Sequence, residues 1–207
     1  MSKKGILLFG GTFDPIHNGH LVIARSAADK IGAQRVVLVP SANPPHKNHS
    51  SLTPARHRLV MTELAVRGQE LFEVSDCELK RPGPSFTIDT VQYFRERYGP
   101  NIPLYWLIGG DTIKELVLWY KVEQLVDECI IVTAGRPGCD IEVDFTVFRG
   151  KLSDEQITRL KQFILETPLL DISATDIRHR IRSSLTISDL TPPAVRDYII
   201  ENNLYKT

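Results

Sequence analysis

Two histidines three positions apart, His17 and His20, follow a glycine-rich turn and carry the most specific chemistry in this chain. The apolar run Ile6–Phe9 before the turn predicts a buried strand, and the amphipathic run after it predicts a helix. We expect Asn18 to cap that helix, which places His20 in its first turn and His17 just outside it. Exposed amide N–H groups, the positive end of the helix dipole and two imidazoles then converge on one small volume, which suits a polyphosphate.

A metal site and an incidental surface turn are the alternatives for these histidines. A zinc site is disfavoured because no further His or Cys stands nearby to complete the ligand set. Gly-Gly turns are common, and a pair of histidines alone is weak evidence for function. The complete string from Gly10 to His20 is much more specific than its parts and favours phosphate binding.

A second pattern typical of anion binding spans Ile172 to Arg178. Ser173 is expected to cap a helix, with Asp176 at the capping-box position. Two hydroxyls, from Ser173 and Thr175, then join free amides and the guanidinium of Arg178, whose planar fork matches phosphate oxygens. Alone, the string is equally typical of an ordinary capped helix with a basic face. Its pairing with the two histidines favours a second phosphate site.

Three further strings offer groups that recognise a small ligand. Prolines in Ser41–Lys47 make a rigid loop that presents His46 and Lys47. A helix that opens near Thr87 offers its hydroxyl and backbone amides to a small anion. The flat ring of Trp119 can stack on a planar heteroaromatic ligand. A turn, a helix cap and core aromatic residues are the respective structural alternatives.

Strand-like and helix-like segments alternate along the chain. The expected strands are Ile6–Phe9, Arg35–Val39, Phe72–Ser75, Leu104–Ile108 and Cys129–Val132, with an extended segment at Phe163–Ile172. The expected helices are Gly19–Ile31, Pro54–Arg67, Ile88–Tyr98, Thr112–Val126, Ser153–Lys161, Ser173–Arg182 and Pro192–Asn203, and Gly135–Lys151 is expected to be a loop.

This alternation predicts an α/β fold, a Rossmann-like doubly wound parallel sheet. We expect a single domain over residues 1–207, with a helical C-terminal part at about 173–207. Ligands of such sheets bind beyond the carboxyl ends of the strands, where the turn Gly10–His20 begins. The GxGxxG spacing of dinucleotide-binding dehydrogenases is absent.

Composition excludes several classes of protein. Lys plus Arg equals Asp plus Glu at 25 each, so no basic field indicates nucleic-acid binding. Three cysteines without a CxxC pair argue against a disulfide framework and favour a cytoplasmic protein. No signal peptide or stretch long enough to span a membrane is expected. The sequence leaves the oligomeric state open.

The two phosphate strings, His17-Asn18-Gly19-His20 and Ile172-Ser173-x-Thr175-x-x-Arg178, resemble the motifs of the HxGH nucleotidyltransferase superfamily. Within it, the chain resembles the bacterial nicotinate mononucleotide adenylyltransferases. That resemblance rests on Ser41–Lys47, Pro84–Thr90, Leu118–Tyr120, Gly109-x-Asp111 and Gly135–Gly138, and it covers nearly the whole chain except Asp140–Glu166.

The resemblance implies adenylyl transfer from ATP to nicotinate mononucleotide by direct in-line attack, with deamido-NAD and pyrophosphate as products. It implies His17, His20 and Arg178 as the catalytic residues. The implied ATP contacts are Gly10, Gly11, Thr12, Phe13, His17, Gly19, His20, Gly109, Asp111, Ile172, Ser173, Thr175 and Arg178. The implied mononucleotide contacts are Asn43, His46, Lys47, Ser85, Thr87, Trp119, Tyr120 and Arg136.

The implied cofactor is Mg²⁺, held mainly by the substrate phosphates rather than by protein ligands. Two alternative functions stay open at this point. Phosphopantetheine adenylyltransferase shares both phosphate strings but has no evident use for a stacking Trp119 or an anion site at Thr87. A nucleotide-binding module without turnover is the second alternative, although both histidines and Arg178 are retained.

Overall fold

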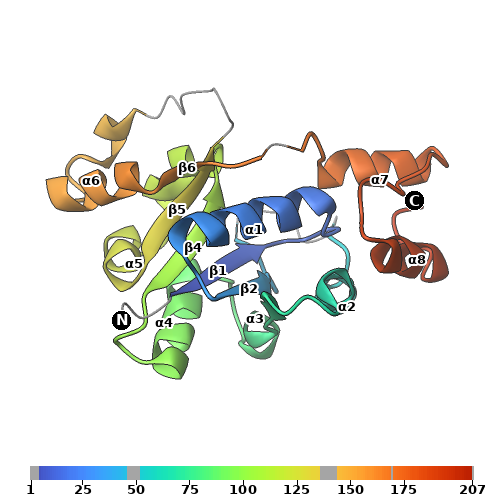
Figure 1. Cartoon of the computed structure of the whole chain (residues 1–207), viewed down its shortest axis with the longest axis horizontal. Coiled ribbons are helices and arrows are strands. Elements are labelled where there is room, and N and C mark those ends of the chain that lie inside the picture. Colours follow the sequence, from blue (N-terminus) through green and yellow to red (C-terminus); the bar gives the residue numbers. More distant parts are fainter. Residues whose placement is uncertain (1–4, 46–51, 136–143, 169, 207) are drawn as a thin grey trace.

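Six parallel strands form the central sheet of this chain, in a computed structural model that describes residues 5–45, 52–135, 144–168 and 170–206 (Figure 1). The strands are β1 (Ile6–Gly11), β2 (Arg35–Pro40), β3 (Phe72–Val74), β4 (Leu104–Gly109), β5 (Ile130–Gly135) and β6 (Ile164–Glu166). They lie in the order β3-β2-β1-β4-β5-β6. The predicted doubly wound parallel sheet is therefore confirmed, and its strand order reverses direction between β1 and β4.

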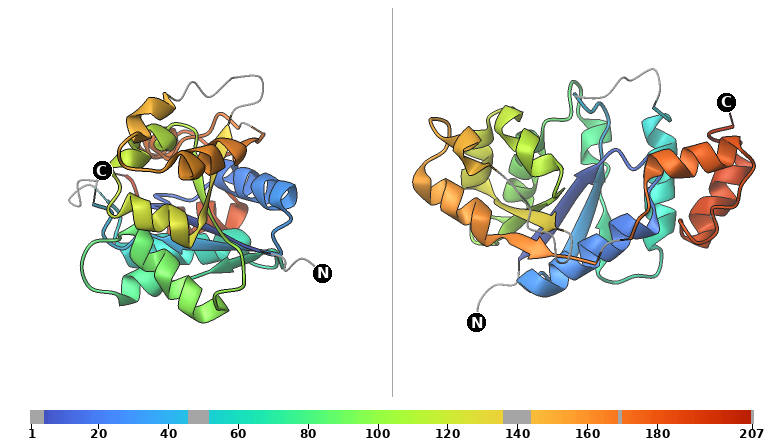
Figure 2. Two further views of the ribbon diagram at one scale, coloured as in Figure 1. Left: turned by 90° about the vertical axis from the view of Figure 1, so that its left-hand side faces the viewer. Right: turned by 90° about the horizontal axis from the view of Figure 1, so that it is seen from above.

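Helices cover both faces of the sheet, because successive side chains of a buried strand point to opposite faces. One face packs against α1 (Asn18–Ile31), α2 (Ala55–Val66), α7 (Ala174–Arg182) and α8 (Pro193–Glu201). The other packs against α3 (Cys77–Lys80), α4 (Thr87–Tyr98), α5 (Val122–Glu128) and α6 (Asp154–Gln162). In Figure 2, α7 and α8 extend beyond the sheet on the side of α2, which α8 contacts.

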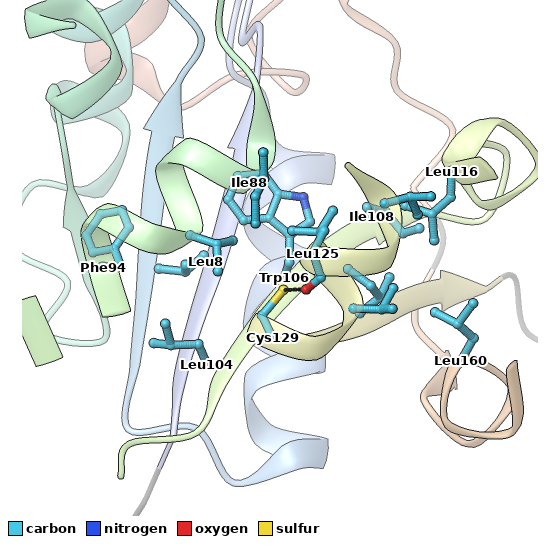
Figure 3. Close-up of a cluster of buried hydrophobic side chains, with 14 of the residues drawn as sticks. Leu8, Ile88, Phe94, Leu104, Trp106, Ile108, Leu116, Leu125, Cys129 and Leu160 are labelled. Carbon is cyan, nitrogen blue, oxygen red and sulfur yellow. Dashed lines mark hydrogen bonds between the residues drawn. The ribbon is translucent and has the colours of Figure 1, made fainter. Parts of the chain in front are cut away.

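The hydrophobic core follows this alternation along β1 and β4. Leu7 and Leu107 belong to the cluster under α1, whereas Leu8 and Trp106 belong to the cluster under α4 and α5. Figure 3 shows Trp106 in the middle of that second cluster, close to Ile88 of α4. The indole is only 3% exposed, so β4 carries a large ring directly beneath the end of β1.

Most predicted elements are present with ends shifted by one or two residues, but the helix predicted over Thr112–Val126 is wrong. A 3-10 helix over Thr112–Leu118 ends at Trp119, and α5 begins only at Val122. Lys121 between them has a left-handed backbone (φ 52°), which no continuous helix allows. The break presents Trp119 and Tyr120 on a turn instead of on a helix face. The predicted extended segment Phe163–Ile172 contains the short strand β6.

Two of the three cysteines, Cys77 and Cys129, are buried and free, and Cys139 lies outside the described residues. Part of the loop predicted at Gly135–Lys151 also lies outside them, and Phe145–Phe148 forms a 3-10 turn. None of the helices in the described ranges is long and apolar enough to cross a membrane.

Candidate active site

The glycine-rich turn leaves the sheet at the point where the strand order reverses, between β1 and β4. At its start, a Cβ atom on Gly10 would lie 2.4 Å from Cζ2 of Trp106, which is closer than any side chain allows. Glycine is therefore required because the backbone of β1 rests directly on the indole of β4. The close approach leaves space above the sheet edge for a ligand.

Gly19 brings the two predicted phosphate strings together. A Cβ atom at this position would lie 3.1 Å from Nδ1 of His17 and 3.8 Å from the Cβ of Ile172. The first turn of α1 therefore touches the segment that leads into α7, although the two are far apart in sequence. Their separation in the sequence does not predict that Gly19 and Ile172 lie so close together.

The two histidine rings stack face to face, with centroids 3.6 Å apart and an interplanar angle of 28°. The backbone N–H of His17 donates to Nδ1 of His20 at 3.2 Å. Because Nδ1 accepts this bond, the neutral His20 ring carries its proton on Nε2, the tautomer that can donate to a phosphate oxygen. Phe13 meets the same ring edge-on at 5.1 Å and fixes its plane.

The helix cap differs from the prediction, because His17 rather than Asn18 occupies the N-cap position of α1. The backbone of His17 is extended (φ −146°, ψ 170°), as an N-cap requires. Asn18 instead binds the segment before α8: its backbone N–H donates to Leu190 O at 2.9 Å and its Nδ2 to Asp189 O at 3.0 Å. Asn18 is therefore the first residue of α1 instead of its cap, and its donors fix the start of the helix to the segment before α8.

Burial keeps the His17 ring neutral. His17 is only 6% exposed, and this burial lowers its pKa to about 4. The ring is therefore neutral at pH 7 and offers one N–H donor but no charge. His20 is half-buried and lies nearer to solvent.

The segment Ile172–Arg178 forms the capped helix N-terminus that its sequence predicts. Ser173 caps α7 by accepting a hydrogen bond from the Asp176 N–H at 3.0 Å. The Asp176 carboxylate makes an ion pair with Arg180 at 2.7 Å, so it does not complete the predicted capping box. Nη1 of Arg178 donates to Asp14 O at 2.7 Å and Nη2 to Thr175 Oγ1 at 3.2 Å. These bonds hold the guanidinium against the turn that carries the histidines.

The side chain of Asp14 connects three segments at this turn. The residue is 4% exposed, and its Oδ1 accepts a bond from the Tyr205 hydroxyl at 2.6 Å. Its Oδ2 accepts from the Thr53 N–H at 3.2 Å. Burial raises the pKa of Tyr205, so the phenol stays protonated and keeps donating. The C-terminal end of the described chain is thereby fastened to the turn between β1 and α1.

Arg58 of α2 binds the backbone of the same turn. It is 1% exposed and donates to three backbone carbonyls: Thr12 O at 2.6 Å, Thr53 O at 2.9 Å and Ala42 O at 3.4 Å. Burial lowers its pKa and nearby Asp14 opposes that shift. The guanidinium thus joins the turn after β1 to the segments that flank the loop after β2.

A cavity of about 300 Å³ opens beside the turn, at the carboxyl ends of β1, β2 and β4. Its polar walls include Thr12, Ser85 and Thr87. The apolar walls are largely aromatic, and the rings are those of Phe9, Phe86, Trp106, Trp119 and Tyr120. Gly10, Gly11 and Gly109 complete the lining among the predicted site residues. A flat heteroaromatic ligand fits this composition.

Hydrogen bonds between two loops build one wall of the cavity. Ser85 Oγ accepts from the backbone N–H groups of Ala42 at 3.1 Å and Asn43 at 3.0 Å. The Asn43 side chain donates to Gly83 O at 3.0 Å, and the Ser85 N–H donates to Asn43 O at 2.9 Å. Asn43 and Ser85, both predicted to contact substrate, therefore hold the loops that shape the cavity.

The broken helix after β4 supplies the opposite wall. The Tyr120 ring lies on Phe86 with centroids 4.4 Å apart, and Trp119 lines the cavity beside them. Thr87, the first residue of α4, also lines the cavity. The structure brings together the three residues, Thr87, Trp119 and Tyr120, that the sequence proposed for one ring system.

Other predicted residues lie apart from the cavity. His17, His20, Phe13, Gly19, Ile172, Ser173, Thr175 and Arg178 lie around the adjoining turn. Asp111 is exposed before the 3-10 helix and does not line the cavity. His46, Lys47 and Arg136 lie outside the described residues.

Sequence reasoning missed several residues at this site. Arg58 lies in a helix without a recognisable motif, and so does Glu78, whose helix is only four residues long. Tyr205 lies near the chain end, where nothing local indicates a role. Asp14 stands inside the recognised string, so its position was a usable signal. Within the described residues, no group of three or more His, Cys, Asp or Glu is placed to hold a metal ion.

Comparisons with known proteins agree with this geometry. The cytidylyltransferase-like family model matches residues 8–180. A protein of Moorella thermoacetica named as a probable nicotinate-nucleotide adenylyltransferase is 43% identical over 202 residues, 96% of this chain and 90% of its own length. A Neisseria meningitidis protein with the same name is 43% identical over 206 residues, 98% of this chain and 99% of its own.

The fold has a counterpart among solved structures. Plasmodium falciparum nicotinic acid mononucleotide adenylyltransferase, complexed with NaAD, superposes with a TM-score of 0.74 and 24% identity. The match covers 98% of this chain and 97% of that one. At this identity the likeness concerns the fold, which agrees with the Rossmann-like sheet described above.

The Asp14 contacts generate a stability prediction. Replacing Tyr205 by Phe leaves Oδ1 of the buried Asp14 without its donor, and we expect the free energy of unfolding to fall by about 1–3 kcal/mol. Urea denaturation followed by circular dichroism measures it. The matched control is Tyr198→Phe, which removes a hydroxyl 2.8 Å from Nδ1 of His57 and away from Asp14. A loss in Tyr205→Phe no larger than in the control would contradict the role of Asp14.

Proposed function

The chain belongs to the nicotinate-nucleotide adenylyltransferases of the cytidylyltransferase-like family, and we propose that it transfers the adenylyl group of ATP to nicotinate mononucleotide. The products are deamido-NAD and pyrophosphate. One observation carries this proposal: an aromatic cavity for a flat ring opens directly beside a turn that gathers phosphate-binding groups. An enzyme that transfers the adenylyl group of ATP to a pyridine nucleotide must hold the two substrates next to each other.

The cavity receives the acceptor. Trp119 stacks on the pyridine ring, and the Thr87 hydroxyl with the Tyr120 amide binds its carboxylate. A site that satisfies a carboxylate leaves polar groups unpaired when an amide takes its place, so the acid is preferred over nicotinamide mononucleotide. His46 and Lys47, outside the described residues, are proposed to hold the mononucleotide phosphate.

The turn and the start of α7 receive the phosphates of ATP. His20 donates from Nε2 and the neutral His17 from its single N–H. Ser173, Thr175 and the first amides of α7 face the β- and γ-phosphates, together with Arg178. The bond from Arg178 to Asp14 O orients the guanidinium before any ligand binds, so little rotamer freedom is lost on binding.

The chemistry requires positioning more than acid-base catalysis. The mononucleotide phosphate is already an anion at neutral pH, and it attacks the α-phosphorus of ATP in line with the departing pyrophosphate. Neither a general base nor a protein nucleophile is needed. The protein holds two anions together and stabilises charge on the transferring group. The buried neutral His17 cannot add charge, so the positive charge at the turn comes from Arg178, and His20 contributes the N–H donor at Nε2.

We propose Mg²⁺ as the ion that accompanies ATP and neutralises part of its phosphate charge. This ion would be held mainly by phosphate oxygens and water. The aromatic cavity favours nicotinate mononucleotide over phosphopantetheine, whose flexible chain carries no ring for Trp119 to stack on.

Substitution of His20 tests the phosphate site. We expect His20→Ala to lower kcat by roughly 100-fold or more, because its N–H stabilises charge that develops in the transition state. Pyrophosphate release with ATP, Mg²⁺ and nicotinate mononucleotide measures the rate. His179→Ala, an exposed histidine in the last turn of α7, is the matched control and should keep the wild-type rate. A folded His20→Ala protein with wild-type kcat would refute the assignment.

Substitution of Trp119 tests the acceptor cavity. Trp119→Ala should raise KM for nicotinate mononucleotide about tenfold, since ring stacking and apolar contact are lost together. KM for ATP should stay unchanged because ATP binds at the turn. Leu118→Ala changes a neighbouring side chain that is 71% exposed and serves as the control. An equal rise of KM for both substrates would instead identify Trp119 as a core residue.

A further inference from the structure

Glu78 is a buried acidic side chain in the wall of the aromatic cavity, and one of its oxygens has no partner. The residue is 4% exposed and lines the cavity. Its Oε1 accepts a hydrogen bond from Thr90 Oγ1 at 2.7 Å. Its Oε2 is buried and makes no hydrogen bond to any described residue. Leaving a buried carboxylate oxygen unpaired is costly, so a positive charge bound in the cavity would stabilise this side chain.

No cation of the described chain binds Glu78 directly, and the guanidinium of Arg81 is linked to its Oε1 through the Thr90 hydroxyl. Glu78 takes part in none of the ion pairs among the described residues. The nearest arginine in sequence, Arg81, donates to Thr90 Oγ1 at 3.1 Å and to Phe86 O at 3.5 Å instead. Buried Arg58 feels the field of Glu78, but its donors bind three backbone carbonyls.

The cavity as a whole has the composition of a site for a flat cation. Among the described residues that line it, the only acidic or basic side chains are Glu78 and Glu115. The aromatic rings around them present π faces, which attract positive charge. An acidic aromatic cavity is unexpected for a ligand whose only charges are phosphates. It is expected for a ligand part that carries a fixed positive charge.

We propose that Glu78 recognises the positive charge of the pyridinium ring in the acceptor nucleotide, and this inference rests on the proposed function. Nicotinate mononucleotide carries a permanent positive charge on its ring nitrogen, which neither ATP nor phosphopantetheine has. Glu78 is thus a specificity determinant for oxidised pyridine nucleotides.

The test compares nicotinate mononucleotide with its reduced 1,4-dihydro form, which keeps carboxylate, ribose and phosphate but has a neutral ring. With wild-type protein, KM for the reduced acceptor should be about tenfold higher or more, as one partly shielded charge pair predicts. In Glu78→Gln, KM for nicotinate mononucleotide should rise about tenfold to the value of the reduced form. KM for ATP should not change.

Thr90→Val is the matched control, because it removes the hydrogen bond to Oε1 and keeps the charge of Glu78. It should retain the preference for the charged acceptor. Equal loss for both acceptors in Glu78→Gln would overturn the inference, as would a wild-type protein that does not distinguish them. A wild-type protein that does not distinguish the two acceptors overturns the inference even if Glu78→Gln fails to fold. A wild-type protein that releases no pyrophosphate with nicotinate mononucleotide would overturn the proposed function as well.

Discussion

The buried carboxylate of Asp14 is the interaction on which the arrangement of this site depends. The carboxylate lies in the turn between β1 and α1 and accepts hydrogen bonds from the Tyr205 hydroxyl and the Thr53 N–H. The backbone carbonyl of Asp14 accepts a third bond, from Arg178. These partners come from the start of α2, from α7 and from the end of the described chain. A buried carboxylate without donors is costly, so the three segments are stabilised together on the turn. The phosphate-binding groups are consequently assembled only when the C-terminal helices have docked.

The site divides its charges between two regions. Arg178, His20 and the start of α7 lie around the turn, where phosphates are expected, whereas the cavity beside them is aromatic and contains only acidic charged groups among its described residues. Electrostatics alone therefore orient an acceptor that has a cationic ring at one end and a phosphate at the other. The phosphate is directed toward the turn, where ATP is bound. This orientation lowers the cost of bringing two anions together.

Sequence patterns predicted the parallel sheet, because apolar strand runs and helix caps are local signals. The patterns failed where contacts between distant segments determine the local structure. Asn18 has the propensity of an N-cap, but α1 begins one residue earlier than predicted, with His17 as its N-cap and with Asn18 bound to Asp189 and Leu190. The helix predicted through Trp119 is interrupted because Lys121 adopts a left-handed backbone, which apolar periodicity does not reveal. Glu78 resembles any charged residue of a short helix until burial is known.

The central claim is that a pyridine-nucleotide cavity and an ATP-phosphate site act together. Pyrophosphate release from ATP and Mg²⁺, compared among nicotinate mononucleotide, nicotinamide mononucleotide and phosphopantetheine, tests this claim most directly. The account predicts turnover with nicotinate mononucleotide at least tenfold better than with the amide, a difference of about 1.4 kcal/mol in transition-state binding. Turnover with phosphopantetheine alone would contradict the assignment of the cavity. No turnover with any of the three acceptors would contradict the proposed enzyme activity.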